Sequence, residues 1–342
     1  MAGLLRAHHA FWRAETDAPI VGRLPAPAWY RPYPLRGGRL AVEPQQVHPD
    51  DLDVDQLVDA PPDDATDGML LRCAGYCFPS AWMEALVGCP IWVSAYGCVA
   101  KPAAVADLGR AAREFRVEKA LASGWWRLMV RAQERAAELA GGRSPVRQLH
   151  LRGVIDMLAA YLGEERLCLS LHEDAAALSL LAEKFTELYI EAVRRGLTLR
   201  PPWRGGRVSL WRIHAPGDLV DYQIDASSLF SARAYEEHFL RHDRKVWRSF
   251  PYSVTHFHAC GMHILEAVLK ADELGVVQVQ MDRETGRWEA DRGPYLRCAG
   301  AAQARGRGFI AHGELAESEL PPLLAALSPR GLAVEYWNPK TS

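Results

Sequence analysis

Short apolar runs alternate with longer amphipathic stretches from residue 68 onwards, and this alternation constrains the fold more than any other feature of the chain. Short apolar runs between polar residues are typical of buried strands, whereas apolar residues three and four positions apart are typical of helices. The strand-like runs are Met69–Cys73, Cys89–Ser94, Gln148–Leu151, Leu167–Leu171, Val208–Ile213, Leu219–Ile224, Val254–His258, Val276–Gln280, Gly308–Ala311 and Leu332–Tyr336. The helical stretches lie near residues 103–141, 173–196, 232–248, 261–273 and 315–327. The order of strands and helices predicts an α/β fold with a parallel sheet and helical crossovers.

The number of strand-like runs is sufficient to close a ring. We therefore predict a (β/α)8 TIM-type barrel over residues 66–342. A doubly wound open sheet is the alternative, and it would carry a glycine-rich phosphate turn after an early strand. The sequence contains no G-x-G-x-x-G turn, Walker loop or G-x-S-x-G elbow, which favours the barrel.

The first 65 residues have a different character. Residues 24–38 contain four prolines and three aromatic residues, and residues 50–67 contain eight aspartates. Prolines interrupt regular elements, and runs of like charge stay in water. We expect residues 1–65 to form an irregular amino-terminal extension packed on the barrel domain.

Composition excludes several classes of partner and compartment. Forty basic and forty-two acidic residues give a formal charge of −2, so no overall field attracts nucleic acid or anionic lipid. The sequence shows neither the roughly 18 consecutive apolar residues of a membrane span nor the apolar run of a signal peptide. Seven scattered cysteines, an odd number, favour reduced thiols. We therefore expect a cytoplasmic, enzyme-sized protein that binds neither nucleic acid nor membrane.

Polar side chains recur where the predicted strands end. In a (β/α)8 barrel the carboxyl ends of the strands carry the chemistry, so these side chains predict one polar mouth. Asp225 and His312 are the predicted catalytic residues, because they can orient a substrate or relay a proton. Each residue taken alone also fits a loop, a helix cap or a satisfied core position. The predicted substrate-binding residues are His150, His172, Trp211, His214 and Gln280.

The segment Thr255–Gly261 contains the most specific local feature, with His256, His258 and Cys260 on one face of an extended strand. Neighbours two apart can bind one ion, whereas the outer pair would be about 13 Å apart. His258 and Cys260 therefore predict a zinc site that takes at least one further ligand from elsewhere. A buried histidine beside a small buried cysteine is the alternative.

Four segments in the right order resemble the uroporphyrinogen decarboxylase superfamily, nearest its zinc-dependent corrinoid/thiol methyltransferase branch. The H-x-C-G motif at residues 258–261 is the most specific of them, and the resemblance covers roughly residues 66–337. The other three segments are Trp82–Ile91, with a W-x-E-A…G-C pattern, the glycine-containing Arg152–Gly163, and Gln223–Ser231, where Asp precedes a serine-rich loop.

The resemblance implies a barrel in which zinc binds a small-molecule thiol and prepares it as methyl acceptor. The methyl donor would be a corrinoid (cobalamin) carried by a partner protein, or a methylated small molecule. The chemistry is sound, because a thiol with a pKa near 8.5 is mostly protonated at neutral pH and zinc coordination deprotonates it.

The last strand departs from the methyltransferase pattern. The family supplies a further zinc cysteine there, whereas residues 331–337 offer only Glu335 as a ligand-type side chain. A carboxylate can complete a zinc site, so Glu335 is the first candidate for the third ligand, Asp282 the second and Cys298 the third.

Three other functions remain open at this point. A uroporphyrinogen-decarboxylase-like decarboxylation calls for an arginine motif that is not recognisable near residues 66–80. A metal-dependent hydrolase or lyase would use His256 and His258 as an H-x-H pair. A non-catalytic barrel that binds a corrinoid or a small methylated ligand would explain the missing third cysteine.

Overall fold

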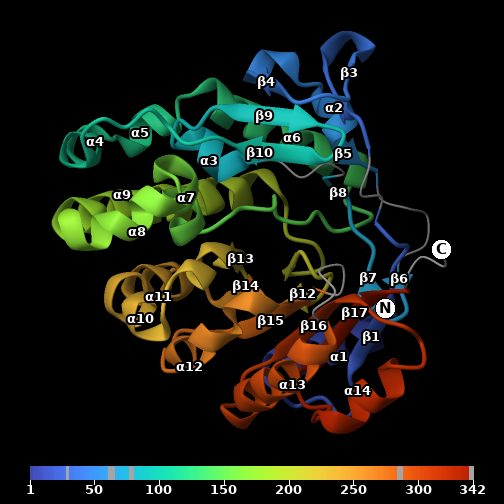
Figure 1. Ribbon diagram of the computed structural model, residues 1–342. Coiled ribbons are helices and arrows are strands. Elements are labelled where there is room, and N and C mark those ends of the chain that lie inside the picture. The colour runs from blue at the N-terminus through green and yellow to red at the C-terminus, as the bar shows by residue number, and fades with distance from the viewer. Residues whose placement is uncertain (28–30, 61–65, 77–80, 283–287, 339–342) are drawn as a thin grey trace.

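The computed structural model describes residues 1–27, 31–60, 66–76, 81–282 and 288–338 of the 342-residue chain. Its centre is a six-stranded parallel sheet with the strand order β1-β17-β16-β15-β14-β13 (Figure 1). The strands are β1 (Ile20–Arg23), β13 (Leu219–Gln223), β14 (Tyr252–His258), β15 (Val276–Met281), β16 (Phe309–Glu314) and β17 (Leu332–Trp337). Because β15 and β17 are buried along their whole length, they need the continuous apolar runs that identified them in the sequence. The predicted parallel α/β sheet is confirmed to this extent.

Helices connect successive strands of the sheet, as the alternation predicted. In Figure 1 they surround the orange and red part of the sheet. The connections are η3 (Asp225–Leu229), α10 (Ala232–His238) and α11 (Leu240–Arg248) after β13, then η4 (Ala259–Ile264) and α12 (Leu265–Val268) after β14, α13 (Trp288–Ala304) after β15 and α14 (Leu320–Ala326) after β16.

The other long helices belong to residues 82–199 and lie above the sheet in Figure 1. They are α3 (Trp82–Leu86), α4 (Leu108–Glu114), α5 (Val117–Ala120), α6 (Gly124–Ala140), α7 (Val154–Leu162), α8 (Glu164–Glu173) and α9 (Ala175–Leu199). Helix α9 contacts α4, α6, α7 and α11, so it joins this region to the helices around the sheet. Beside it lies an antiparallel sheet of β4 (Gln45–Val47), β9 (Ile91–Ser94) and β10 (Gly97–Ala100).

The remaining elements are short, apart from α1. They are α1 (Ala2–Trp12), α2 (Val54–Leu57), η1 (Arg36–Gly38), η2 (Pro49–Asp51), β2 (Tyr33–Pro34), β3 (Leu40–Ala41), β5 (Val58–Asp59), β6 (Thr66–Asp67), β7 (Leu70–Leu71), β8 (Gly75–Tyr76), β11 (Arg207–Val208) and β12 (His214–Ala215). Among the described residues, no helix combines the length and the apolar character needed to cross a membrane.

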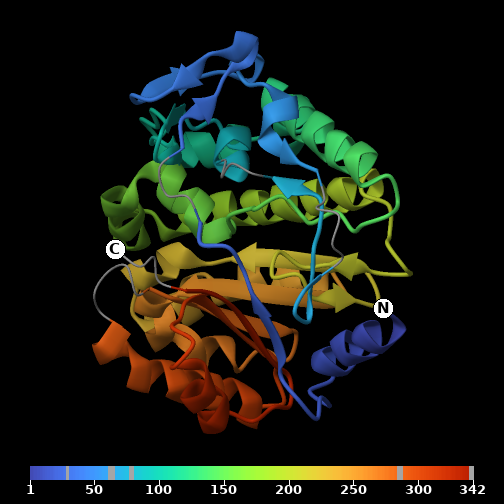
Figure 2. The same cartoon turned by 90° about the vertical axis from the view of Figure 1, so that its right-hand side faces the viewer.

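The amino-terminal segment contributes a strand to the central sheet. Ile20–Arg23 pair in parallel with Ala333–Tyr336 of β17, so the blue and red ends of the chain lie side by side in Figures 1 and 2. Ile20 is completely buried there, which makes β1 part of the core. The irregular extension expected from the sequence is therefore wrong for these four residues, and the division of the chain at residue 65 stays a prediction.

Two further segments approach the gap between β1 and β13 without forming long strands. Met69 N donates to Val21 O at 2.9 Å, and Ala74 forms an isolated parallel bridge with Val146. These contacts bring residues 69–76 beside β1 and residue 146 beside residue 74. The continuously hydrogen-bonded sheet has six strands, and these two segments are not among them.

Residues 146–152 in turn reach β13, where the Gln148 side chain donates to Asp221 O at 2.7 Å and accepts from Asp221 N at 3.3 Å. Arg152 forms an isolated parallel bridge with Gln223. A Cβ added to Gly153 would lie 2.1 Å from the carbonyl oxygen of Gln223, so the two backbones can meet only because residue 153 is glycine.

Three of the strand predictions are wrong in whole or in part. Leu167–Leu171 lie in α8, where Leu167 and Ser170 are buried and Leu169 is 47% exposed, a spacing of three that fits a helix. Gln148–Leu151 form no regular strand, and of Val208–Ile213 only Val208 belongs to one. Short apolar runs do not distinguish strands from helix segments or buried loops, and packing decided each case.

Candidate functional site

Four polar residues form a row across the carboxyl-terminal half of the sheet. His258 of β14 pairs with Gln280, Gln280 with His312, and His312 with Glu335 of β17. Residues paired in register share one face of a sheet, so the four side chains point to the same side. This row confirms that polar residues at successive strand ends come together.

A cavity of about 760 Å³ opens beside this row. Its walls come from the sheet, from the segments around residues 147–150 and 210–212, and from Leu24, Pro25, Pro27 and Arg31. Seven of the residues singled out in the sequence line it: His150, Trp211, His256, His258, Gln280, His312 and Glu335.

Asp225, His256 and His258 form a group that could hold a metal ion, because one ligand atom from each lies within 4.8 Å of the others. His256 Nε2 is 3.4 Å from Asp225 Oδ1, and His258 Nε2 is 3.8 Å from Asp225 Oδ2. Two imidazole nitrogens and one carboxylate are a donor set found around zinc and other divalent transition metals. The alternation of β14 places residues 256 and 258 on one face, which is the H-x-H pair that the sequence offered as an alternative to His258 with Cys260.

The Nδ1 atoms of both histidines are already engaged, which leaves Nε2 as the ligand atom. His258 Nδ1 lies 2.5 Å from Asp282 Oδ1, and His256 Nδ1 contacts the side-chain oxygen of Gln278. When Nδ1 donates to an oxygen, the tautomer and the ring orientation are fixed and Nε2 keeps its lone pair.

The electrostatics of the group also fit a cation. Burial lowers the pKa of His256 to about 3, and the neighbouring His258 acts in the same direction. The imidazole of His256 is therefore neutral, as a metal ligand must be. Burial raises the pKa of Asp225, and its buried Oδ1 makes no hydrogen bond with any described residue. A bound cation would satisfy that oxygen and stabilise the carboxylate.

Two aromatic rings enclose His256 on its remaining sides. The Trp211 ring stacks on it with centroids 5.7 Å apart, and His150 stands edge-on at 6.5 Å. Burial also lowers the pKa of His150 to about 3, so it is a neutral group in the cavity wall.

Glu335 pairs with His312 and does not belong to the group of three. Its Oε1 lies 3.3 Å from His312 Nδ1. Burial by itself would raise the pKa of Glu335, but the contact with His312 and the charges of Arg212 and Arg147 outweigh it and lower the pKa. Glu335 is therefore a carboxylate with a histidine partner.

The other predicted ligands occupy different positions. Cys260 is exposed in η4. Partial burial and the charges of Asp282 and Asp225 raise the pKa of its thiol, against an opposite effect of Ser228, so Cys260 lies at the edge of the group. Asp282, the second candidate for the third ligand, holds His258 Nδ1. Cys298 is buried in α13, and burial raises its pKa to about 12.

His172 and His214 do not line the cavity. His172 is exposed near the end of α8, because the predicted strand there is a helix. His214 is buried in β12, with Nδ1 3.0 Å from His9 Nε2 and Nε2 3.0 Å from the carbonyl oxygen of Trp203. The first of these contacts brings α1 against β12, which the local sequence does not reveal.

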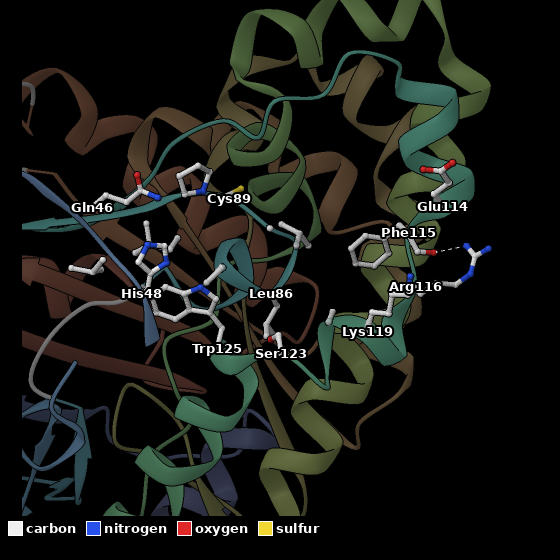
Figure 3. Close-up of a pocket in the computed structure, with 17 residues that line it drawn as sticks. Gln46, His48, Leu86, Cys89, Glu114, Phe115, Arg116, Lys119, Ser123 and Trp125 are labelled. Atoms are coloured by element: carbon white, nitrogen blue, oxygen red, sulfur yellow. Dashed lines mark hydrogen bonds between the residues drawn. The ribbon is translucent and has the colours of Figure 1, made fainter. Parts of the chain in front are cut away.

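A second cavity, of about 560 Å³, lies between β4, α3 and the α4–α6 region (Figure 3). Gln46 and His48 lie at one end of it, and Glu114 and Arg116 at the other. Arg116 donates to the carbonyl oxygen of Phe115 at 2.9 Å. None of the predicted site residues lines this cavity.

Comparison with solved structures supports the fold. The chain is similar in structure to a methyltransferase from Methanosarcina mazei, with a TM-score of 0.60 and 12% sequence identity, over 97% of this chain and 92% of that one. No family model and no curated protein matches the sequence. At this identity the likeness shows a shared architecture, a mixed α/β fold with a central parallel sheet that is consistent with a TIM-like fold.

Proposed function

We propose that this protein is a metal-dependent methyltransferase of the uroporphyrinogen decarboxylase-like type, with zinc held by Asp225, His256 and His258. The observation that carries the proposal is the convergence of these three side chains with both Nδ1 atoms engaged. The fold shared with a methyltransferase supports the reaction class. Cys260 at the edge of the group is the proposed additional ligand.

The proposed reaction moves a methyl group from a corrinoid, or a methylated small molecule, to a thiol. Zinc bound to the three residues would lower the pKa of the thiol and leave nucleophilic character on its sulfur. His312 Nδ1 lies 3.3 Å from Glu335 Oε1, and the proposed role of His312 Nε2 is to accept the proton that the thiol releases. Glu335 then stabilises the imidazolium that results. Trp211 and His150 cover one side of the group and exclude water there.

The closed barrel belongs to the same proposal. The contacts of residues 69–76 and 146–152 connect β1 to β13 through isolated parallel bridges. We propose that these two segments take the places of two strands, so that the cavity is the mouth of a (β/α)8 ring.

Metal content per chain and methyl transfer from methylcobalamin to a panel of thiols test the proposal together. The wild type should bind about one zinc and consume methylcobalamin only when thiol is present. His256→Gln and His258→Gln should lose most of the zinc, whereas Cys260→Ser, which leaves the three principal ligands in place, should lose much less. His172→Gln, in an exposed histidine outside the cavity, is the matched control.

Two results would change the assignment. Loss of zinc in Cys260→Ser with retention in His256→Gln would restore the His258 and Cys260 pair that the sequence predicts. Protein that binds no zinc and transfers no methyl group would contradict the proposal and favour a ligand-binding barrel.

A metal-dependent hydrolase or lyase is the second candidate. It is favoured by the same donor set, because two imidazoles and a carboxylate without sulfur are also the ligands of metals that activate water. Hydrolysis of activated esters by the zinc-loaded protein, without thiol-dependent loss of methylcobalamin, would support it over the methyltransferase.

A further inference from the structure

One wall of the cavity carries buried hydrogen-bond donors with no acceptor among the described residues. The Nε of Arg147 and the hydroxyl of Tyr76 are both buried and make no hydrogen bond there, and both residues line the cavity. The two groups are close enough for the charge of Arg147 to act on the Tyr76 hydroxyl. A buried donor without an acceptor has lost its hydration and gained no bond in return, so this wall is unfavourable unless a ligand supplies acceptors.

The chain makes room for Arg147 at this place. A Cβ on Gly75 would lie 2.5 Å from Arg147 Nη2 and 2.8 Å from Nε. A side chain at position 75 would displace the guanidinium, so glycine at this position allows Arg147 to lie against this wall.

Arg212 brings a second guanidinium to the same cavity. Its backbone has φ of 64°, a left-handed conformation that is strained for a residue with a side chain. The Asp67 carboxylate is 3.3 Å from Arg212 Nη1, but Arg72 binds it more closely, at 2.8 and 2.5 Å. Arg212 therefore keeps donors for another partner.

The carboxylates around this wall do not supply the missing acceptors. Asp67 accepts hydrogen bonds from Arg72 and from Arg212, one on each oxygen. The charges of Arg147 and Arg212 act on Glu335, and that of Arg147 acts on Asp221, but no hydrogen bond joins either arginine to these two carboxylates among the described residues. An anionic ligand would supply acceptors to Arg147 Nε and to the Tyr76 hydroxyl.

We propose that Arg147, Arg212 and Tyr76 bind the anionic end of a small-molecule substrate, a carboxylate or a phosphoryl group. The site lies next to the metal group, because the charge of Arg147 acts on His150, whose ring is 6.5 Å from that of His256. A ligand anchored at the arginines thus extends past His150 towards Asp225, His256 and His258. That this ligand is a methyl acceptor or donor rests on the proposed function, whereas anion binding does not.

Thermal shift and titration calorimetry with acetate and with inorganic phosphate test the proposal on chelator-treated protein, with acetamide as the neutral probe. Both anions should stabilise the wild type at equal ionic strength, and acetamide should not. Arg147→Gln should weaken binding by about tenfold or more, the range of a charge-assisted hydrogen bond, and Arg147→Lys should recover part of it. Arg233→Gln, in an exposed arginine on α10, is the control and should bind as the wild type does.

The relative affinity of the two anions identifies the group, since a carboxylate site prefers acetate and a phosphoryl site prefers phosphate. If Arg147→Gln fails to fold, Tyr76→Phe supplies the test and should weaken binding several-fold. No binding by the wild type, or equal binding by the wild type and Arg147→Gln, would overturn the proposal. Because the metal is absent from this experiment, a failure of the methyltransferase assignment cannot produce either result.

Discussion

Asp282 connects His258 to the backbone that follows it. His258 Nδ1 lies 2.5 Å from Asp282 Oδ1, and Asp282 Oδ2 accepts a hydrogen bond from the backbone N–H of Ala259 at 2.9 Å. One carboxylate at the end of β15 therefore fixes both the ring of His258 and the turn by which β14 ends. Carboxylates in this position orient a ligating histidine and increase its basicity.

Asp282→Asn should therefore lower zinc affinity by about 10- to 100-fold without removing any proposed ligand. Competition with a chromophoric chelator measures the change. Asp272→Asn alters an exposed carboxyl that precedes β15, at the opposite end of the strand from Asp282, and should have no effect. Unchanged affinity in Asp282→Asn would mean that His258 is not a ligand or that its orientation needs no support.

Glu335→Gln separates the two roles considered for this residue. Because Glu335 pairs with His312 at 3.3 Å, we expect the variant to keep its zinc and to lose about 100-fold in turnover, the lower range for a general acid–base group. Zinc content and turnover are measured on the same preparation, with Glu314→Gln as the control. Greater zinc loss in Glu335→Gln than in Glu314→Gln would place Glu335 among the ligands, as the sequence predicts.

Gly153→Ala should destabilise the fold, since the new Cβ would lie 2.1 Å from the carbonyl oxygen of Gln223. We expect a loss of about 1–3 kcal/mol in the free energy of unfolding, typical of an overpacked contact, measured by denaturant titration. Gly300→Ala is the matched control. It lies in α13 with nothing within 4 Å of the added carbon, and it should be neutral or slightly stabilising.

Asp243 should make stability fall as pH rises. Burial raises the pKa of this carboxyl from 3.8 to about 7, although Tyr222 and Tyr235 both donate hydrogen bonds to it. Between pH 4 and 7 the unfolded chain has released the proton that the folded chain keeps, so the free energy of unfolding decreases as pH rises through this window. At 1.36 kcal/mol per pH unit, the full contribution is up to about 4 kcal/mol.

Asp243→Asn removes this titration, so the difference in stability between the variant and the wild type should change across that window. Urea unfolding at intervals between pH 4 and 8 measures it. Parallel curves for the two proteins would show that Asp243 has the same pKa in the folded and unfolded chains.

The sequence identified the carboxyl-terminal strands and the polar row on them. β14 to β17 are rich in apolar residues because parallel strands are buried on both faces, and their register places His258, Gln280, His312 and Glu335 in one row. Both the apolar content of a strand and the alternation of its side chains can be read from neighbouring residues in the sequence. The same kind of signal failed at Leu167–Leu171, because a short apolar run also fits a helix that buries one side.

The sequence by itself thus determined the α/β class, the parallel sheet and four members of the site. Tertiary structure alone decided which of those side chains meet. Asp225 joins His256 and His258 because β13 lies beside β14, Glu335 joins His312 because β16 lies beside β17, and β1 enters the sheet from the far end of the chain. The physical reason is that local patterns fix the face a residue occupies, whereas its partner depends on strand order and on contacts between segments distant in sequence.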